Sequence, residues 1–121
     1  MTEYSMDENG EIFKDPATSD DLSKWANEYH EKYFSGTPEP TIKTAFTSEP
    51  GQAGCFIPAH GSVLIPQALA GFEKACRIVL LHEMVHIRLF LENGDADPEH
   101  GDRFKAEINR LFSSGAYGNL L

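Results

Sequence analysis

The sequence predicts a single α+β domain, in which one helix precedes a small sheet of short strands and two further helices follow it. The length of 121 residues fits one domain of ordinary size. The hydrophobic content of 40% and the aromatic content of 11% are enough for a packed core. Segments of helical periodicity lie on both sides of a stretch rich in β-forming residues. We expect the domain to span residues 18–114.

Residues 1–17 are expected to form a flexible acidic arm. They carry five acidic residues against one lysine, and their few apolar residues follow no period. A tail over residues 115–121, which contains Tyr117, is expected to be mobile as well. The formal net charge of the whole chain is −9 at pH 7.

The first predicted helix begins after Thr18 or Ser19, because either side chain can cap the helix N-terminus. Asp20 and Asp21 then carry the charge that favours a first turn. Pro38 prevents the helix from continuing. Residues three, four, seven and eleven positions after Leu22 give the helix one apolar face, which is expected to lie in the core. They are Trp25, Ala26, Tyr29 and Tyr33.

Short strands are predicted next. Residues 41–47 are rich in β-formers and lie between two prolines, so they indicate a strand. Residues 53–57 and 62–65 flank a segment that contains Pro58 and Gly61, which is typical of a β-hairpin.

Two helices complete the domain. The first is predicted over residues 69–92 and ends at Asn93-Gly94; its apolar centre indicates a central position. The second is predicted to begin at Asp97-Pro98, as a cap followed by a proline in the first helical position. Its expected apolar stripe is Phe104, Ile108, Leu111 and Phe112.

The central helix carries the motif His82-Glu83-Met84-Val85-His86. Residues four apart lie on the same face of a helix, so His82 and His86 can bind one zinc ion. Glu83 can reach a zinc-bound water without becoming a ligand and can accept its proton. Two histidines and a glutamate inside an apolar helix are costly unless something satisfies them.

A catalytic zinc site usually has three protein ligands, and three downstream residues compete for the third place. Glu92 has the spacing of an extended motif, but Leu89 replaces the glycine that the turn would need. Glu107 has the spacing of a thermolysin-type arrangement. His100 shares a helical face with the apolar stripe, which directs it inward, so the pattern favours His100.

The motif and the later His100-Gly101-Asp102-Arg103-Phe104 resemble the SprT-like metallopeptidase family. The resemblance covers about residues 20–112 and implies a zincin-like minimal protease fold with a small antiparallel sheet. It also implies His82, His86 and His100 as ligands of one zinc ion per chain, and Glu83 as the general base. The best-known members cleave proteins crosslinked to DNA.

The expected substrate is a protein or peptide. Family members often add a cysteine-rich zinc ribbon or a basic DNA-binding segment, and the sequence contains neither. With its acidic charge, the chain is not expected to bind nucleic acid unaided. No apolar run approaches the length of a membrane span and no signal segment is visible, so we expect a cytoplasmic monomer without a membrane partner. The alternative function is a non-catalytic, zinc-stabilised module that binds a protein.

Overall fold

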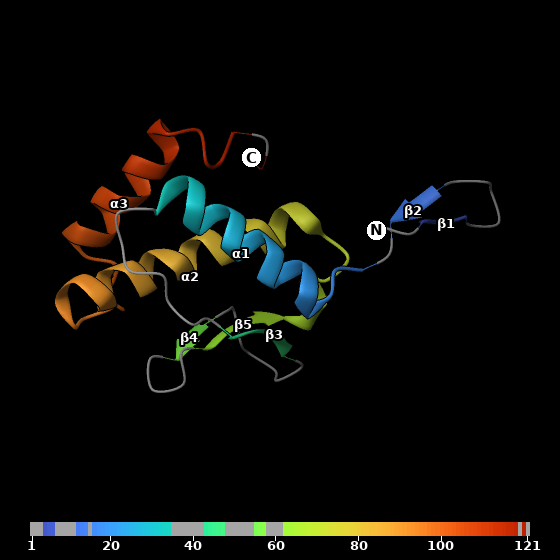
Figure 1. Cartoon of the computed structure of the whole chain (residues 1–121), viewed down its shortest axis with the longest axis horizontal. Helices are drawn as coiled ribbons and strands as arrows, with labels where there is room; N and C mark the ends of the chain where they lie inside the picture. Colours follow the sequence, from blue (N-terminus) through green and yellow to red (C-terminus); the bar gives the residue numbers. More distant parts are fainter. Residues whose placement is uncertain are drawn as a thin grey trace.

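Three α-helices, two small sheets and a short 3-10 helix form the described part of the chain (Figure 1). The computed structural model describes residues 4–6, 12–14, 16–34, 43–47, 55–57, 62–118 and 120. In chain order the elements are β1 (Tyr4–Met6), β2 (Ile12–Lys14), α1 (Ser19–Tyr33), β3 (Lys43–Thr47), β4 (Cys55–Ile57), β5 (Ser62–Pro66), η2 (Gln67–Leu69), α2 (Glu73–Asn93) and α3 (Asp102–Ser113). This mixture of helices with a small sheet agrees with the predicted α+β class.

Helix α1 begins where its sequence predicts. Thr18 is the N-cap and forms a capping box with Asp21. The Asp21 backbone N–H donates to Thr18 Oγ1 at 3.3 Å, and the Thr18 backbone N–H donates to Asp21 Oδ2 at 2.9 Å. The apolar face is buried as predicted at Leu22, Trp25, Ala26 and Tyr29, while Tyr33 is half-buried and packs against the core.

The three-stranded sheet has the order β3-β5-β4. Strands β4 and β5 are antiparallel, which confirms the predicted pairing, although residues 58–61 of the intervening turn lie outside the described part. Strand β3 pairs with the other edge of β5 and runs parallel to it, with Ala45 opposite Leu64. The expectation of a wholly antiparallel sheet is therefore wrong. Strands β3 and β4 therefore pair with opposite edges of β5.

Helices α1 and α2 lie side by side over one face of this sheet, and α3 lies against the C-terminal part of α2 (Figure 1). A contact of 2.7 Å between Ser23 Oγ and Thr44 Oγ1 joins α1 to β3. The core lies between these layers. Its fully buried larger side chains are Leu22, Ile65, Leu80, Leu81, Leu111, Val63, Val85 and Cys76.

The acidic arm contains a two-stranded hairpin that the sequence pattern does not predict. Strand β1 pairs with β2 in antiparallel orientation. In Figure 1 this hairpin stands beside the three-helix body. The chain joins the body at Ala17, whose backbone N–H donates to the Ala70 carbonyl at 2.7 Å.

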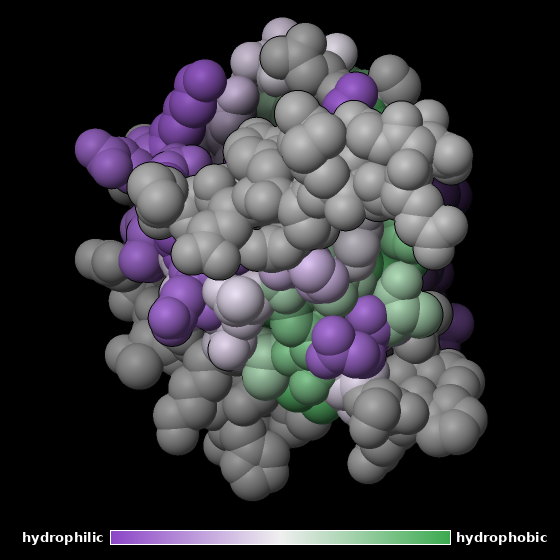
Figure 2. All heavy atoms as spheres, turned by 90° about the vertical axis from the view of Figure 1, so that its right-hand side faces the viewer, coloured by the Kyte–Doolittle hydropathy of each residue, from purple (hydrophilic) through white to green (hydrophobic). Residues whose placement is uncertain are grey.

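Two apolar side chains near the C-terminus differ from expectation. Tyr117 is buried in the core rather than mobile, and its ring stacks on Phe112 with a centroid distance of 4.4 Å. Phe112 itself is 49% exposed, so it does not belong to the buried stripe of α3. Figure 2 shows apolar side chains among hydrophilic ones on the face that lies at the right of Figure 1. None of the helices formed by the described residues has the length and apolar character that crossing a bilayer requires.

Candidate metal centre

Helix α2 places His82 and His86 one above the other. It begins at Glu73, four residues later than predicted, because Gln67–Leu69 form the 3-10 helix η2 instead. It ends as predicted, with Gly94 in the left-handed conformation at φ 73° and its N–H donating to the Phe90 carbonyl. The helix is thus continuous through both histidines.

His100 joins the two helical histidines, although the chain brings it there differently from the prediction. Helix α3 begins at Asp102 and has Gly101 as its N-cap, so the expected start at Asp97-Pro98 is wrong. His100 belongs to the preceding loop and has a left-handed backbone with φ 56°. The loop conformation, and not a helical stripe, therefore directs its side chain.

The Nε2 atoms of the three histidines form a nearly equilateral triangle. They lie 3.2 Å apart for His82 and His100, 3.2 Å for His86 and His100, and 3.3 Å for His82 and His86. Across the described ranges this is the one group of three or more His, Cys, Asp or Glu side chains that could hold a metal ion. We call it the histidine cluster.

The proton on His86 is fixed by the backbone. Its Nδ1 lies 2.6 Å from the carbonyl oxygen of Ala96, which can only accept. The Nδ1–H therefore donates to this carbonyl, and the Nε2 lone pair of the neutral ring points at His82 and His100. Metal-binding histidines commonly have such an outer partner, because it fixes the tautomer and the ring orientation.

No distribution of protons turns all three contacts of the histidine cluster into hydrogen bonds. With His86 Nε2 as an acceptor, a proton on the Nε2 of either His82 or His100 leaves one pair of acceptors facing each other. Protons on both leave two donors facing each other. A cation at the centre would interact favourably with all three lone pairs at once.

Burial keeps the helical histidines neutral. Burial, together with the nearby His86 and His100, lowers the pKa of His82 to about 4. Burial also lowers the pKa of His86, against the opposing effects of the Ala96 hydrogen bond and of Asp97. Both rings are therefore available to a metal ion at neutral pH, because only the neutral imidazole has a free lone pair.

The ring of Phe104 covers the histidine cluster on one side. Its centroid lies 4.9 Å from that of His82, 4.7 Å from that of His86 and 4.5 Å from that of His100. Phe104 is 6% exposed. This apolar contact limits the orientations that the three imidazole rings can adopt.

Glu83 follows His82 directly on helix α2 and is buried, with 5% of its surface exposed. Burial raises the pKa of its carboxyl group to about 7. The structure gives it no hydrogen bond or ion pair with another described residue. A carboxyl group of this kind can take up and release a proton near neutral pH.

The two competing carboxylates lie in a separate ion-pair cluster that joins α2 to α3. Arg88 Nε lies 2.9 Å from Glu92 Oε1 and 3.2 Å from Glu107 Oε2. Arg110 forms a two-pronged contact with Glu107, at 2.6 and 2.9 Å. Glu92 and Glu107 are thus engaged by arginines and are not grouped with the histidines.

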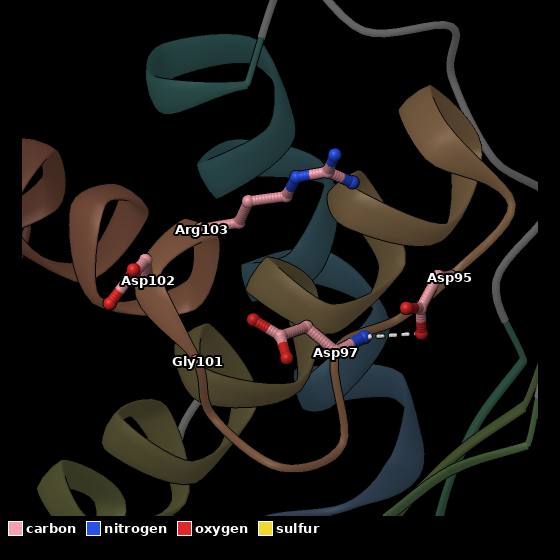
Figure 3. A pocket seen from close by; sticks show the side chains of 5 residues that line it. All are labelled: Asp95, Asp97, Gly101, Asp102 and Arg103. Carbon is pink, nitrogen blue, oxygen red and sulfur yellow. Dashed lines mark hydrogen bonds between the residues drawn. The ribbon is translucent and has the colours of Figure 1, made fainter.

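The sequence pattern expects Asp97 to be the N-cap residue directly before the last helix, and it does not predict the contact that Asp97 makes with Phe104. Asp97 is half-buried, and its Oδ2 accepts the Phe104 backbone N–H at 3.2 Å. It lines an open surface cavity of about 330 Å³ (Figure 3). The signal that could have found it is Gly101, a glycine where a helix would normally have a capping side chain. The other residues around this cavity are Asp95, Gly101, Asp102 and Arg103.

Comparison with known proteins agrees with the geometry. The family model described as "SprT-like family" matches residues 22–117, which is most of the chain. That family is related to the zincin-like metallopeptidases. No curated protein and no solved structure matches the chain. From its histidine cluster and from this match, the chain belongs to the SprT-like family.

Proposed function

We propose that this chain is a zinc-dependent peptidase of the zincin type. In this proposal His82, His86 and His100 hold one zinc ion, and Glu83 is the general base for hydrolysis of a peptide bond. The observation that carries the proposal is the convergence of three Nε2 atoms, with a buried glutamate next to His82 on the same helix. Membership of the SprT-like family supports it.

The size of the histidine cluster supports zinc as the ion. Zinc binds imidazole nitrogen at roughly 2.0–2.1 Å in tetrahedral geometry, which places neighbouring nitrogens roughly 3.3–3.4 Å apart. The measured separations of 3.2 to 3.3 Å are close to this value. Three protein ligands also leave a fourth position open, as catalytic zinc sites do.

Zinc, when bound, supplies a Lewis acid that polarises a carbonyl group and makes water more acidic. The remaining chemistry belongs to the chain. The carboxylate of Glu83 accepts a proton from the attacking water and then gives it to the leaving amine nitrogen as the peptide bond breaks. Its pKa of about 7 suits both transfers. Its burial also limits competition from solvent water.

The sheet offers a way to hold an extended substrate. Strand β4 pairs with β5, packs near α2, and is an edge strand among the described strands. An extended peptide can bind such an edge through backbone hydrogen bonds, with little dependence on its sequence. We therefore propose flexible or unfolded protein segments as substrates.

The net charge of −9 repels the phosphate backbone of nucleic acids, so we expect the chain alone to bind duplex DNA only weakly. Fluorescence anisotropy at physiological salt measures this binding.

The decisive comparison is between the zinc-loaded chain and its Glu83→Gln variant on an unfolded protein substrate. Glutamine keeps the size of glutamate but cannot accept the proton. We expect cleavage, measured by mass spectrometry of the fragments, to fall at least about 10²- to 10⁴-fold. Zinc content should stay at one per chain.

Glu92→Gln is the matched control, because it makes the same change on the solvent side of the same helix. It should cleave at a rate near that of the parent chain. Equal rates for Glu83→Gln and the parent chain would contradict the mechanism. A parent chain that binds zinc but cleaves no unfolded substrate would favour a protein-binding module instead.

A further inference from the structure

Asp97 makes three contacts in the loop that carries the third histidine. Its Oδ2 accepts the Phe104 backbone N–H at 3.2 Å. Its backbone carbonyl accepts the His100 N–H at 3.0 Å, and its own N–H donates to Asp95 Oδ1 at 3.0 Å. The residue before it is Ala96, whose carbonyl orients His86. One short segment thus contacts two members of the histidine cluster.

The Asp97 carboxylate caps helix α3 from outside the helix. The first backbone N–H groups of a helix have no partner within it and are usually satisfied by the side chain of the N-cap residue. The N-cap here is Gly101, which has no side chain. Asp97 supplies the missing acceptor to Phe104, the third residue of α3. Figure 3 shows the Asp97 carboxylate pointing from the loop toward the start of α3, whereas Asp102 points away from it.

The close approach of Asp97 explains the glycine at position 101. A Cβ atom added there would lie 3.2 and 3.3 Å from the two carboxylate oxygens of Asp97. The backbone of Gly101 has φ −74°, which any residue can adopt, so its conformation does not require glycine. A side chain at this position would instead be in tight contact with the carboxylate, which would have to shift by a few tenths of an ångström.

The backbone between these contacts is strained at both ends. Asp97 and His100 have φ values of 53° and 56°, in the left-handed region that most side chains avoid. Asp and His are among the residues that tolerate it best. Such a turn persists only when its surroundings hold it, and here the capping contact of Asp97 and the His100 N–H bond do so.

We propose that Asp97 is a positioning residue that holds His100 at the metal site. The proposal deepens the proposed zinc function and rests on it. The carboxylate ties the start of α3 to the loop, so the backbone of His100 and the ring of Phe104 are fixed together. His100 then meets His82 and His86 without a further ordering cost when the ion binds.

The test compares Asp97→Ala with Asp97→Asn in the full chain. Alanine removes the acceptor and disfavours the left-handed backbone, whereas asparagine keeps an acceptor oxygen and tolerates that backbone. Zinc affinity, measured by competition with a chromophoric chelator, should fall about 10- to 100-fold in Asp97→Ala. The visible spectrum of the cobalt-loaded variant should change as well. Asp97→Asn should remain near the parent chain in both measurements.

Asp102→Ala is the matched control, because it removes the same charge from the same surface cavity without touching the cap. It should bind zinc like the parent chain. Should Asp97→Ala fail to fold, Gly101→Ala replaces it, since the added methyl group displaces the carboxylate and should also weaken zinc binding.

An unchanged zinc affinity and cobalt spectrum in Asp97→Ala would overturn the positioning role while leaving the metal site intact. An equal loss of zinc affinity in Asp97→Asn and Asp97→Ala would also overturn the positioning role, because the charge of Asp97 and not its geometry would then determine the affinity. A parent chain that binds neither zinc nor cobalt would remove the metal function itself, and the role of Asp97 with it.

Discussion

Helix α2 contributes residues to two polar clusters. They differ in whether the groups of each cluster can satisfy one another by ion pairs or hydrogen bonds. The ion-pair cluster of Arg88, Glu92, Glu107 and Arg110 contains two cations and two anions, and its contacts join each acid to a base. The histidine cluster brings together three imidazole nitrogens of the same kind, and no arrangement of protons turns all three contacts into hydrogen bonds. The first cluster therefore stabilises the packing of α3 by itself. The second has the ligand set that a bound cation would complete.

The same contrast distinguishes Glu107 from Glu83. Glu107 is held by Arg88 and Arg110 and has a structural role. Glu83 is buried and has no such partner among the residues that the structure describes, and burial raises its pKa to about 7. Burying a carboxyl group without a counter-charge destabilises the fold. Such a group is therefore a candidate for a functional role, and here that candidate is Glu83.

The largest expected effect comes from removing the two helical histidines together. His82→Ala with His86→Ala should abolish stoichiometric zinc binding, measured by elemental analysis after refolding with zinc. The parent chain should gain about 4 kcal/mol of stability at a zinc concentration 1,000-fold above its Kd. At about 4 to 8 °C per kcal/mol, its melting temperature should rise by at least about 15 °C on zinc addition, and that of the double variant should not. An equal zinc content in both proteins would disprove the site.

A smaller effect is expected from the third histidine alone. His100→Ala should weaken zinc binding by more than about 100-fold, beyond the 10- to 100-fold that is typical of an outer-shell partner. Glu107→Ala should leave zinc affinity nearly unchanged, because its carboxylate is engaged by two arginines. Chelator competition measures both variants. A larger loss in Glu107→Ala would assign the third ligand to α3 instead.

The smallest effect is expected in the ion-pair cluster. Glu107→Gln should lower the free energy of unfolding of the metal-free chain by about 1.5–3 kcal/mol, since it weakens charge-assisted hydrogen bonds to Arg110 and Arg88. Urea denaturation measures this change. His100→Ala, whose side chain is exposed, should change the same quantity much less. A larger loss of unfolding free energy in His100→Ala than in Glu107→Gln would contradict the assignment of stability to the ion-pair cluster and of metal binding to the histidine cluster.

Local patterns in the sequence predict the parts of the site that a single helix determines. The spacing of His82 and His86 and the stop at Gly94 depend only on helix geometry, and the structure shows both. The pattern favours His100 because it extends a helical stripe, but in the structure His100 lies in a loop and has a left-handed backbone. That loop depends on a contact between Asp97 and Phe104, seven residues apart, which no periodicity reveals.

The sequence pattern does not predict the pairing of β3 or the burial of Tyr117, because both depend on contacts between residues that no local periodicity reveals. A hairpin signal fixes the antiparallel pairing of β4 and β5, because their connection is short. Strand β3 has only five residues, and its alternation does not specify which edge of β5 it joins or in which direction. Tyr117 follows the end of α3 by four residues, where no periodic signal remains, and the core rather than local propensity determines its place.

X-ray absorption at the zinc edge of the loaded chain reports directly which atoms surround the ion. We expect one zinc per chain with three imidazole nitrogens at roughly 2.0–2.1 Å and one further light atom. The imidazole signal should weaken in His100→Ala and stay unchanged in Glu107→Ala. Fewer than three imidazoles in the parent chain, or sulfur at roughly 2.3 Å, would contradict the histidine cluster as the metal site.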